Sequence, residues 1–337
     1  MAKLTNISGF PEWLPQQKLL EDKIVGTIKA IYESHGFVPI ETPSVELLST
    51  LCSKGVVDKE IYGLRRLSSD QDKEELGLHF DLTVPFARYT AQHFNDLVFP
   101  FKRYQLQRVW RGERPQKGRF REFYQFDIDT VAREQLPLSC DAEILHVLDK
   151  VFCALDLGAH VLRVNNRKIL LGLYQSLEIA EEQRSAVVTI VDKINKIGSD
   201  GVLKELQKDL SLDSELAEKI LNYCSLCFSA YDFEENFSKL SITDSLFDEG
   251  VAELREILGL LPEESLSRIE IDLSLARGLD YYTGLIVETL FVDHQDFGSV
   301  GGGGRYEGLV SQFLNKQVPG VGVSIGITRI MSLILEH

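Results

Sequence analysis

Residues 102–130 read KRYQLQRVWRGERPQKGRFREFYQFDIDT, and this stretch decides the fold. The composition of residues 99–111 and 120–131 is typical of β-strands, and the segment between them carries the turn-forming residues Gly112, Pro115 and Gly118. Two strands joined in this way predict an antiparallel hairpin, with a loop that is too long for a tight turn.

The second predicted strand divides its side chains between two faces, because successive residues of a strand point to opposite sides. The apolar face is expected to be buried and holds Tyr124, Phe126 and Ile128. The other face is expected to be accessible, and it combines a cation, a ring, an amide and two carboxylates: Arg121, Phe123, Gln125, Asp127 and Asp129. This row predicts a binding surface for a phosphorylated ligand that also carries a cationic or hydrogen-bonding group.

Positive charge is concentrated in the same segment. Residues 102–121 contain eight Lys or Arg and one acid, a local charge of +7, whereas the whole chain has a formal charge of −15. We therefore expect the segment to bind an anion. The acidity of the other residues argues against a general nucleic-acid coat, although a local basic patch is able to dock RNA.

The composition is that of a globular protein whose 337 residues suggest one large domain or two of ordinary size. We see no run of about 18 apolar residues and no leader-like start, so we expect a cytoplasmic location and no membrane partner. Five cysteines at scattered spacings suit reduced thiols. Cys224 and Cys227 form a lone CxxC, which we interpret as thiols on a buried helix face, with metal or redox use as the alternative.

Periodicity and turn signals divide the chain into three parts. We expect an α+β fold in which one mixed, mostly antiparallel sheet is flanked by helices and interrupted by a helical insertion. The expected parts are core residues 1–165, the insertion at 166–262, and further core residues 263–337. Expected helices cover 16–34, 83–94, 141–155, 181–197, 212–228 and 304–313, with a final helix at the C-terminus. Expected strands, besides the hairpin, cover 37–40, 161–164, 269–275, 284–292 and 320–325.

Three further segments carry residues suited to chemistry. Asp81 and Thr83 precede a predicted helix, where they form an N-cap pair or bind a ligand ammonium. Arg277, in a glycine-flanked bend, either pairs with Asp280 or binds a phosphate or carboxylate through its planar donors. The glycine run at 298–304 lacks the Gly-Lys-Ser/Thr of a Walker loop. It is therefore a flexible turn, or a place where the backbone approaches a ligand ahead of a helix.

Arg329 is the last chemically suggestive residue, because a strand of small residues leads directly to it at the start of a helix. An arginine in that place is suited to close over a polyphosphate or to stack on a base. Taken together, the segments resemble the class II aminoacyl-tRNA synthetases, and specifically the histidyl-tRNA synthetase family. The three class motifs are matched by Ile40–Pro43, Trp110–Phe123 and Gly326–Arg329, and two histidine-specific signatures by Arg277–Tyr282 and Gly303–Val310.

The resemblance implies that histidine is joined to ATP with release of pyrophosphate and is then passed to tRNA(His). The attacking carboxylate and the α-phosphate are both anionic, so orientation and electrostatic stabilisation should supply most of the rate. By resemblance Arg111 and Arg277 are catalytic, and adenine lies between Phe123 and Arg329. Mg²⁺ is expected on the β- and γ-phosphates, and no motif for a protein metal site is present. The implied ATP-binding residues are Arg111, Glu113, Arg121, Phe123 and Arg329.

The resemblance also assigns residues to histidine and to tRNA. Asp129 and Tyr282, with Tyr281 beside them, would bracket the imidazole nitrogens. The α-ammonium would be held by Asp81, Thr83 and Gln125. The hairpin loop would meet the tRNA acceptor end through Arg114, Gln116, Lys117 and Arg119. The family further implies a homodimer, with the first motif at its interface, and an insertion that clamps the acceptor end.

One feature departs from the family. Full-length members continue past the third motif into an anticodon-binding domain, whereas this sequence stops at His337, eight residues after Arg329. We expect either a catalytic-domain fragment or a natural short paralogue. Short paralogues of this fold serve as histidine-binding regulatory subunits of ATP phosphoribosyltransferase, without ligase activity. The presence of all four arginines expected at the site, Arg111, Arg121, Arg277 and Arg329, favours the ligase.

Overall fold

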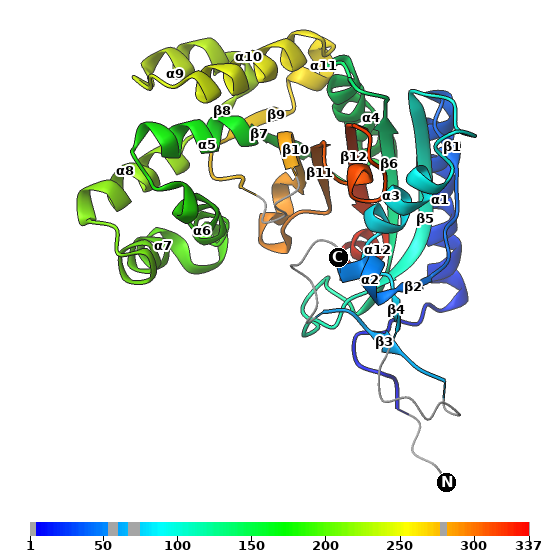
Figure 1. Ribbon diagram of the computed structural model, residues 1–337. Helices are drawn as coiled ribbons and strands as arrows, with labels where there is room; N and C mark the ends of the chain where they lie inside the picture. The colour runs from blue at the N-terminus through cyan, green and yellow to red at the C-terminus, as the bar shows by residue number, and fades with distance from the viewer. Residues whose placement is uncertain (1–4, 53–59, 67–74, 277–281, 337) are drawn as a thin grey trace.

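The computed structural model describes residues 5–52, 60–66, 75–276 and 282–336 (Figure 1). These residues form a nine-stranded mixed sheet of order β1-β5-β6-β12-β11-β10-β7-β9-β8 and a three-stranded sheet of order β2-β4-β3. The strands are β1 (Val38–Pro39), β2 (Val45–Leu47), β3 (Gly63–Leu64), β4 (Leu76–Leu78), β5 (Phe101–Trp110), β6 (Glu122–Val131), β7 (His160–Asn166), β8 (Cys227–Ser229), β9 (Ile269–Asp272), β10 (Tyr282–Phe291), β11 (Gly301–Tyr306) and β12 (Gly320–Gly326).

The helices of the core cover both faces of the large sheet. Buried apolar residues of α1 and α4 pack with Phe126 and Ile128 on one face, while α3 lies in front of the β5–β6 hairpin in Figure 1. The core helices are α1 (Pro15–Ser34), α2 (Leu48–Leu51), α3 (Thr83–Gln92), α4 (Ser139–Leu155), α11 (Glu263–Leu266) and α12 (Ile327–Glu336). The α+β class and the mixed, mostly antiparallel sheet are therefore confirmed.

The predicted hairpin is confirmed in detail. Strands β5 and β6 pair antiparallel over ten residues each, and Arg103 stands directly opposite Asp129. Gln105 faces Asp127 in the same register. Directly opposed residues of an antiparallel pair share one face of the sheet, so β5 extends the polar row of β6 sideways.

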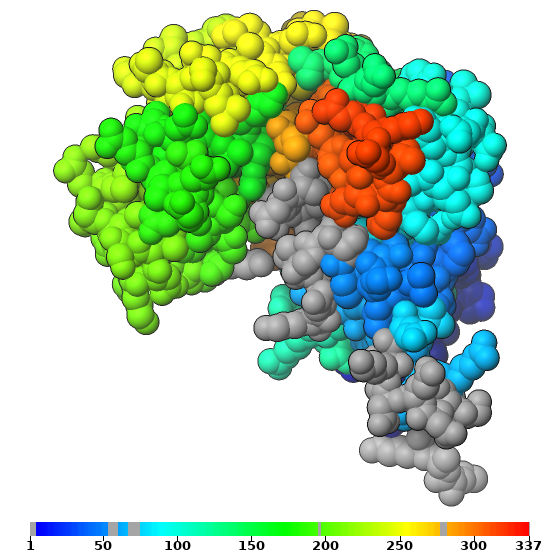
Figure 2. Space-filling model, in the orientation of Figure 1, coloured from blue at the N-terminus to red at the C-terminus, as the bar shows by residue number. Residues whose placement is uncertain are grey.

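The middle region packs at the far end of the sheet, where α5 and α10 contact β7 and β10. Its elements are α5 (Arg167–Ser176), α6 (Glu181–Val191), α7 (Ile194–Leu210), α8 (Ser214–Cys224), the 3₁₀ turn η2 (Ala230–Asp232), α9 (Phe233–Lys239) and α10 (Ser245–Gly259). The face drawn in Figure 2 is hollowed between this green lobe and the blue and cyan lobe. The domain boundaries at 165/166 and 262/263 stay a prediction.

The expectation of a helix through 212–228 is wrong at its end. Helix α8 stops at Cys224, and residues from Cys227 form β8, which pairs antiparallel with β9 at the edge of the large sheet. Only Cys224 is buried, whereas Cys227 is exposed. The two cysteines therefore lie on different elements and do not share one helix face. In the part of the chain that the structure describes, no helix is both long and apolar enough to cross a membrane.

Residues 301–304 of the glycine run belong to a strand, which corrects the flexible-turn alternative and the helix expected at 304–313. Residues 301–306 form β11 between β10 and β12, and only the short 3₁₀ turn η4 (Val310–Gln312) follows. The 3₁₀ turn η3 (Val292–Phe297) precedes β11. Glycine is needed in these strands because neighbouring strands crowd the positions where Cβ atoms would lie. A Cβ on Gly304 would lie 2.9 Å from Cδ1 of Tyr282, and one on Gly320 would lie 2.4 Å from Cε2 of Tyr306.

Gly322 supplies a test of this packing. A Cβ there would lie 2.0 Å from Oδ1 of Asp129, whereas a Cβ on Gly308 meets no atom within 4 Å. We expect Gly322→Ala to lower the free energy of unfolding by about 1–3 kcal/mol, because overpacking displaces a buried side chain. Urea unfolding measures it, with Gly308→Ala as the control. Equal stability of the two variants would contradict the packing described.

Candidate functional site

The polar row predicted on β6 lies on the face of the sheet that α3 covers. Asp127 and Asp129 are buried, so the expectation of an accessible face is wrong for this half of the strand. The ring of Phe86, from α3, lies 4.3 Å from the guanidinium carbon of Arg103. The row therefore runs from a partly exposed end near Phe123 into a closed interior.

Asp129 is held at the buried end by two partners. A terminal nitrogen of Arg103 lies 2.5 Å from its Oδ2, and the hydroxyl of Tyr306 donates to its Oδ1 at 2.8 Å. Burial, followed by the neighbouring Asp129, raises the pKa of Tyr306 well above its usual range, so its hydroxyl keeps the proton that it donates.

Asp127 is a second carboxylate in the same cluster. Burial raises its pKa to about 7, and the nearby charges of Asp129 and Asp81 add to that effect. Arg103, 4.0 Å away, and a hydrogen bond from Ser324 act in the opposite direction. Asp127 is thus poised to change charge near neutral pH.

Two buried acceptor atoms in the row have no hydrogen-bond partner among the described residues: Oε1 of Gln125 and Oδ1 of Asp127. The amide nitrogen of Gln125 donates to Oγ of Ser324 at 2.8 Å, which fixes the amide and points its oxygen away from Ser324. Buried acceptors of this kind are costly unless a donor meets them. A ligand ammonium or ring N–H is a suitable donor.

The segment before α3 brings Asp81 beside Arg111. Oδ1 of Asp81 accepts the backbone N–H of Val84 at 3.0 Å, which confirms a capping role, and Thr83 begins the helix. Nε of Arg111 donates to the carbonyl of Phe80 at 3.0 Å. An anion-binding guanidinium and a cation-binding carboxylate thus lie on adjoining segments, as a zwitterionic amino acid requires.

The residues predicted for ATP lie at the exposed end of the row. The guanidinium of Arg111 stands 5.2 Å from the ring centre of Phe123, and Nε of Arg121 donates to the carbonyl of Glu113 at 3.1 Å. Arg329 has another aromatic neighbour, Phe297: it donates to the Phe297 carbonyl and stands 5.1 Å from the ring centre. The adenine sandwich of Phe123 and Arg329 stays a prediction.

Two predicted residues, Arg277 and Tyr281, lie outside the described residues, and so does Asp280. Tyr282 is described as the first residue of β10 and is buried against Gly304, on the strand next to it. It thus lies on the same part of the sheet as Tyr306, its cross-strand neighbour.

The four residues predicted for tRNA form the exposed loop of the hairpin. Gln116 and Arg119 exchange two backbone hydrogen bonds of 3.1 and 2.9 Å, which close the loop tip. Lys117 pairs with Glu336 of α12 at 3.0 Å. Exposure is shared by all four side chains: Arg114, Gln116, Lys117 and Arg119. The loop therefore presents cations to solvent, as a nucleic-acid contact requires.

Sequence reasoning missed Arg103, Ser324 and Glu60. Arg103 was counted only as a basic residue, although the predicted hairpin register places it opposite Asp129. Ser324 follows only from the pairing of β12 with β6. Glu60 lies beside Glu113 and Arg111; partial burial first, then Glu113, raises its pKa. No local signal in the sequence marks Glu60.

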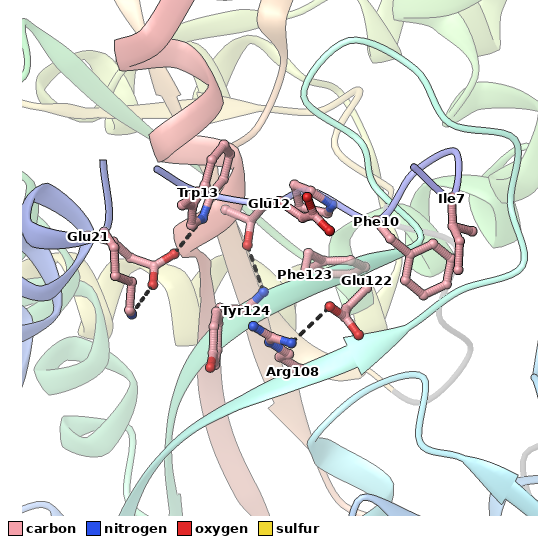
Figure 3. Close-up of a pocket in the computed structure, with 12 residues that line it drawn as sticks. Ile7, Phe10, Glu12, Trp13, Glu21, Arg108, Glu122, Phe123 and Tyr124 are labelled. Carbon is pink, nitrogen blue, oxygen red and sulfur yellow. Dashed lines mark hydrogen bonds and ion pairs between the residues drawn. The ribbon is translucent and has the colours of Figure 1, made fainter. Parts of the chain in front are cut away.

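A separate cavity of about 440 Å³ lies under the N-terminal segment (Figure 3). Trp13 donates to Glu21 at 2.9 Å on one side of it, and Arg108 donates to Glu122 at 3.0 Å on the other. Among the predicted site residues that the structure describes, only Phe123 lines it. The cavity is therefore distinct from the row of Gln125, Asp127 and Asp129.

Comparison with known proteins agrees with this arrangement. The chain is 42% identical, with a TM-score of 0.87, to the crystal structure of histidyl-tRNA synthetase from Nostoc sp. PCC 7120, covering all of this chain and 76% of that one. Its catalytic fold is thus that of the class II aminoacyl-tRNA synthetases. A profile of the family described as Histidyl-tRNA synthetase matches residues 9–330. The chain belongs to the histidyl-tRNA synthetase family.

Two further relatives mark the range of this similarity. Histidine--tRNA ligase of Thermobifida fusca (strain YX) is 48% identical over 336 residues, which cover 99% of this chain and 76% of the relative. An ATP phosphoribosyltransferase regulatory subunit/histidyl-tRNA synthetase from Bacillus halodurans C is 20% identical, with a TM-score of 0.82 over 98% of this chain and 83% of that chain. That second likeness shows the fold alone.

The raised pKa of Asp127 predicts how stability depends on pH. The folded pKa of about 7 exceeds the usual value of 3.8, so the folded state alone holds this proton between those values. Stability contributed by this group therefore falls as pH rises from about 4 to about 7. Asp127→Asn should remove that fall in urea unfolding followed across this range. Asp209→Asn, an exposed aspartate, is the control, and an unchanged pH profile in Asp127→Asn would contradict the assignment.

Proposed function

We propose that the chain activates L-histidine with ATP to give histidyl-adenylate and pyrophosphate, and then transfers histidine to tRNA(His). One observation carries the proposal: a single strand, β6, bears acceptors for two ends of an amino acid. Gln125 and Asp129 stand four residues apart on one face, and both oxygens of Asp129 are held in fixed directions.

Histidine would be read along this strand. Asp81, Thr83 and Gln125 would bind the α-ammonium. This placement is supported by Oε1 of Gln125, which has no hydrogen-bond partner among the described residues. Asp129 would accept a ring N–H, with Tyr282 and Tyr281 completing the pocket. A site that satisfies both ring nitrogens rejects analogues that leave buried groups unpaired.

Arg111 would hold the α-phosphate and the substrate carboxylate, with Arg277 working opposite it. The transition state carries extra negative charge on the non-bridging oxygens, and fixed guanidinium groups stabilise that charge without reorganising. The hydrogen bond from Arg111 to Phe80 supports this role because it fixes the guanidinium before substrate arrives. Adenine would stack on Phe123 beside Glu113, with Arg121 toward the phosphates and Arg329 over the base.

Mg²⁺ would neutralise charge on the β- and γ-phosphates of ATP. The carboxylates of Glu60 and Glu113, which face each other beside Arg111, offer the oxygen donors that this ion prefers. By contrast, the described cluster of Asp149, Cys153 and His160 does not fit this ion. Its Asp149 is already bound through both oxygens by Arg268.

The partners beyond the small substrates are also proposals. The hairpin loop and the 166–262 region would contact the acceptor end of tRNA(His), and the chain would form a homodimer in the cytoplasm. Exposed apolar side chains near the first motif, Val38, Val45 and Leu47, support an interface there. The regulatory alternative has weaker support, because the likeness to the regulatory subunit concerns the fold alone.

Asp129→Asn tests the assignment of histidine recognition. Asparagine has nearly the same shape as aspartate, so Arg103 is not left beside an empty space. It replaces one carboxylate oxygen, a charged acceptor, by an amide NH₂ group. Histidine-dependent ATP–pyrophosphate exchange should fall about 100-fold in kcat/KM, since hydrogen bonds to charged groups contribute roughly 1.5–3 kcal/mol. Near-normal exchange would refute the role of Asp129. Exchange by the unchanged protein with an amino acid other than histidine, or with none, would refute the proposed function.

Arg277→Ala provides an independent test of the chemistry. We expect adenylate formation to be lost almost completely, with histidine and ATP still bound, because the charge of the transition state is left without one of its two guanidinium partners. Single-turnover formation of histidyl-adenylate measures it. Full activity in the variant would remove Arg277 from the mechanism.

The loop assignment separates the two steps of the reaction. Arg114→Ala combined with Arg119→Ala should lower aminoacylation of tRNA about 10-fold or more, because two cations that face the phosphates are lost. Pyrophosphate exchange should be unchanged, since both side chains lie on the exposed loop. Equal losses in both assays would place these arginines in the activation step.

A further inference from the structure

Arg103 is fully buried, and none of the substrate contacts proposed above involves it. It stands opposite Asp129 across the β5–β6 hairpin, with one terminal nitrogen 2.5 Å from Oδ2 of Asp129 and 4.0 Å from Oδ2 of Asp127. A buried guanidinium is retained only at a cost in desolvation, which its partners must offset. The position therefore calls for a specific role.

The guanidinium is fixed from its other side as well. Its second terminal nitrogen donates to Oε1 of Gln105 at 3.2 Å, and the Gln105 amide in turn donates to Oγ1 of Thr42 at 2.9 Å. Gln107 closes the chain by donating to the Thr42 carbonyl at 2.7 Å and accepting its N–H at 3.1 Å. With Phe86 on its face, Arg103 is held in one plane by residues of β5, α3 and the first motif.

The fixed guanidinium plane of Arg103 influences the orientation of the Asp129 carboxylate. Arg103 holds one carboxylate oxygen and Tyr306 holds the other, from strands on opposite sides of β6, while Gly322 leaves the space that the carboxylate occupies. An ion pair at one oxygen and a hydrogen bond at the other restrict how this carboxylate turns, so the direction in which Asp129 accepts a donor is restricted as well. That restricted direction is what recognition of a ring N–H demands.

Asp127 decides the charge of the cluster. Arg103 and Asp129 alone would be formally neutral, and a neutral pair attracts a cationic or hydrogen-donating ring weakly. The second carboxylate lies on the same face, so the group is negative when Asp127 is ionised and formally neutral when Asp127 is protonated. Other charged or polar groups that face it are Asp81 before α3 and Ser324 on β12.

We propose that Arg103 is a positioning residue for histidine recognition: it fixes the direction in which Asp129 accepts the imidazole N–H. The inference rests on the proposed function, because it concerns the same pocket. According to this proposal, recognition of the imidazole ring depends on residues of both β5 and β6, and not on Asp129 alone.

The test compares Arg103→Met, Asp127→Asn and their combination in ATP–pyrophosphate exchange by the whole protein. Arg103→Met should raise the KM for histidine at least ~10-fold, since a small misplacement of a recognition group is costly, while the KM for ATP changes less than about twofold. The combined variant has the formal charge of the unchanged protein but no guanidinium. Its KM for histidine should stay raised, and a return to the original value would show that charge balance alone matters.

Arg268→Met is the matched control, because Arg268 also binds a buried aspartate, Asp149, at the other end of the sheet. It should leave the KM for histidine unchanged, and parallel effects in Arg103→Met and Arg268→Met would reduce Arg103 to a structural role. If Arg103→Met does not fold, Arg103→Lys keeps the charge without the planar fork and should still raise the KM. An unaltered KM in Arg103→Lys would overturn the proposal. Failure of the unchanged protein to exchange with histidine would instead refute the proposed function.

Discussion

The structure depends on the pairing of β6 with a different strand on each side. The apolar face of β6 packs under α1 and α4, and its polar face receives Arg103 from β5 and Ser324 from β12. A shift of one residue in either pairing would exchange these faces and place carboxylates in the apolar core. The strand register that keeps the apolar core dry is therefore the same register that places Arg103 and Ser324 beside the carboxylates of β6. The loop between β5 and β6 is long enough to carry its cations without changing this register.

The glycines of β11 and β12 are a second consequence of how the strands pair. β11 consists mostly of glycine, which has little intrinsic preference for strands, whereas Val321, Val323 and Ile325 of β12 favour them. The side chains of Asp129 and Tyr306 occupy the volume where Cβ atoms on Gly322 and Gly320 of β12 would be. At Gly303 and Gly304 of β11, backbone oxygens of neighbouring strands lie in that volume. The polar row therefore lies over the glycines of β12, and a register shift between Tyr282 and Ile286 interrupts the pairing of β10 with β11.

The hairpin and the division of β6 into two faces could be predicted because they depend on local periodicity. The roles of the site residues rest on the family resemblance and stay predictions. The burial of Asp127 and Asp129 could not be predicted, because it depends on α3 docking across the sheet. The strand character of residues 301–306 was missed for a similar reason: local rules assign glycine to turns, and the need for glycine arises from other strands. The three-residue β8 is an edge strand whose only signal is its partner β9. Arg277 and Tyr281 lie outside the described residues, so their predicted roles rest on the sequence.

The shared space of Gly322 and Asp129 has a consequence for evolution. A change of amino-acid preference at this pocket cannot proceed by single substitutions. Shortening Asp129 alone removes the ion-pair partner of a buried guanidinium, and enlarging residue 322 alone collides with the carboxylate. Mutational paths to a new specificity must pass through paired changes on adjacent strands, and such coupling isolates this pocket from those of other amino-acid ligases built on the same sheet.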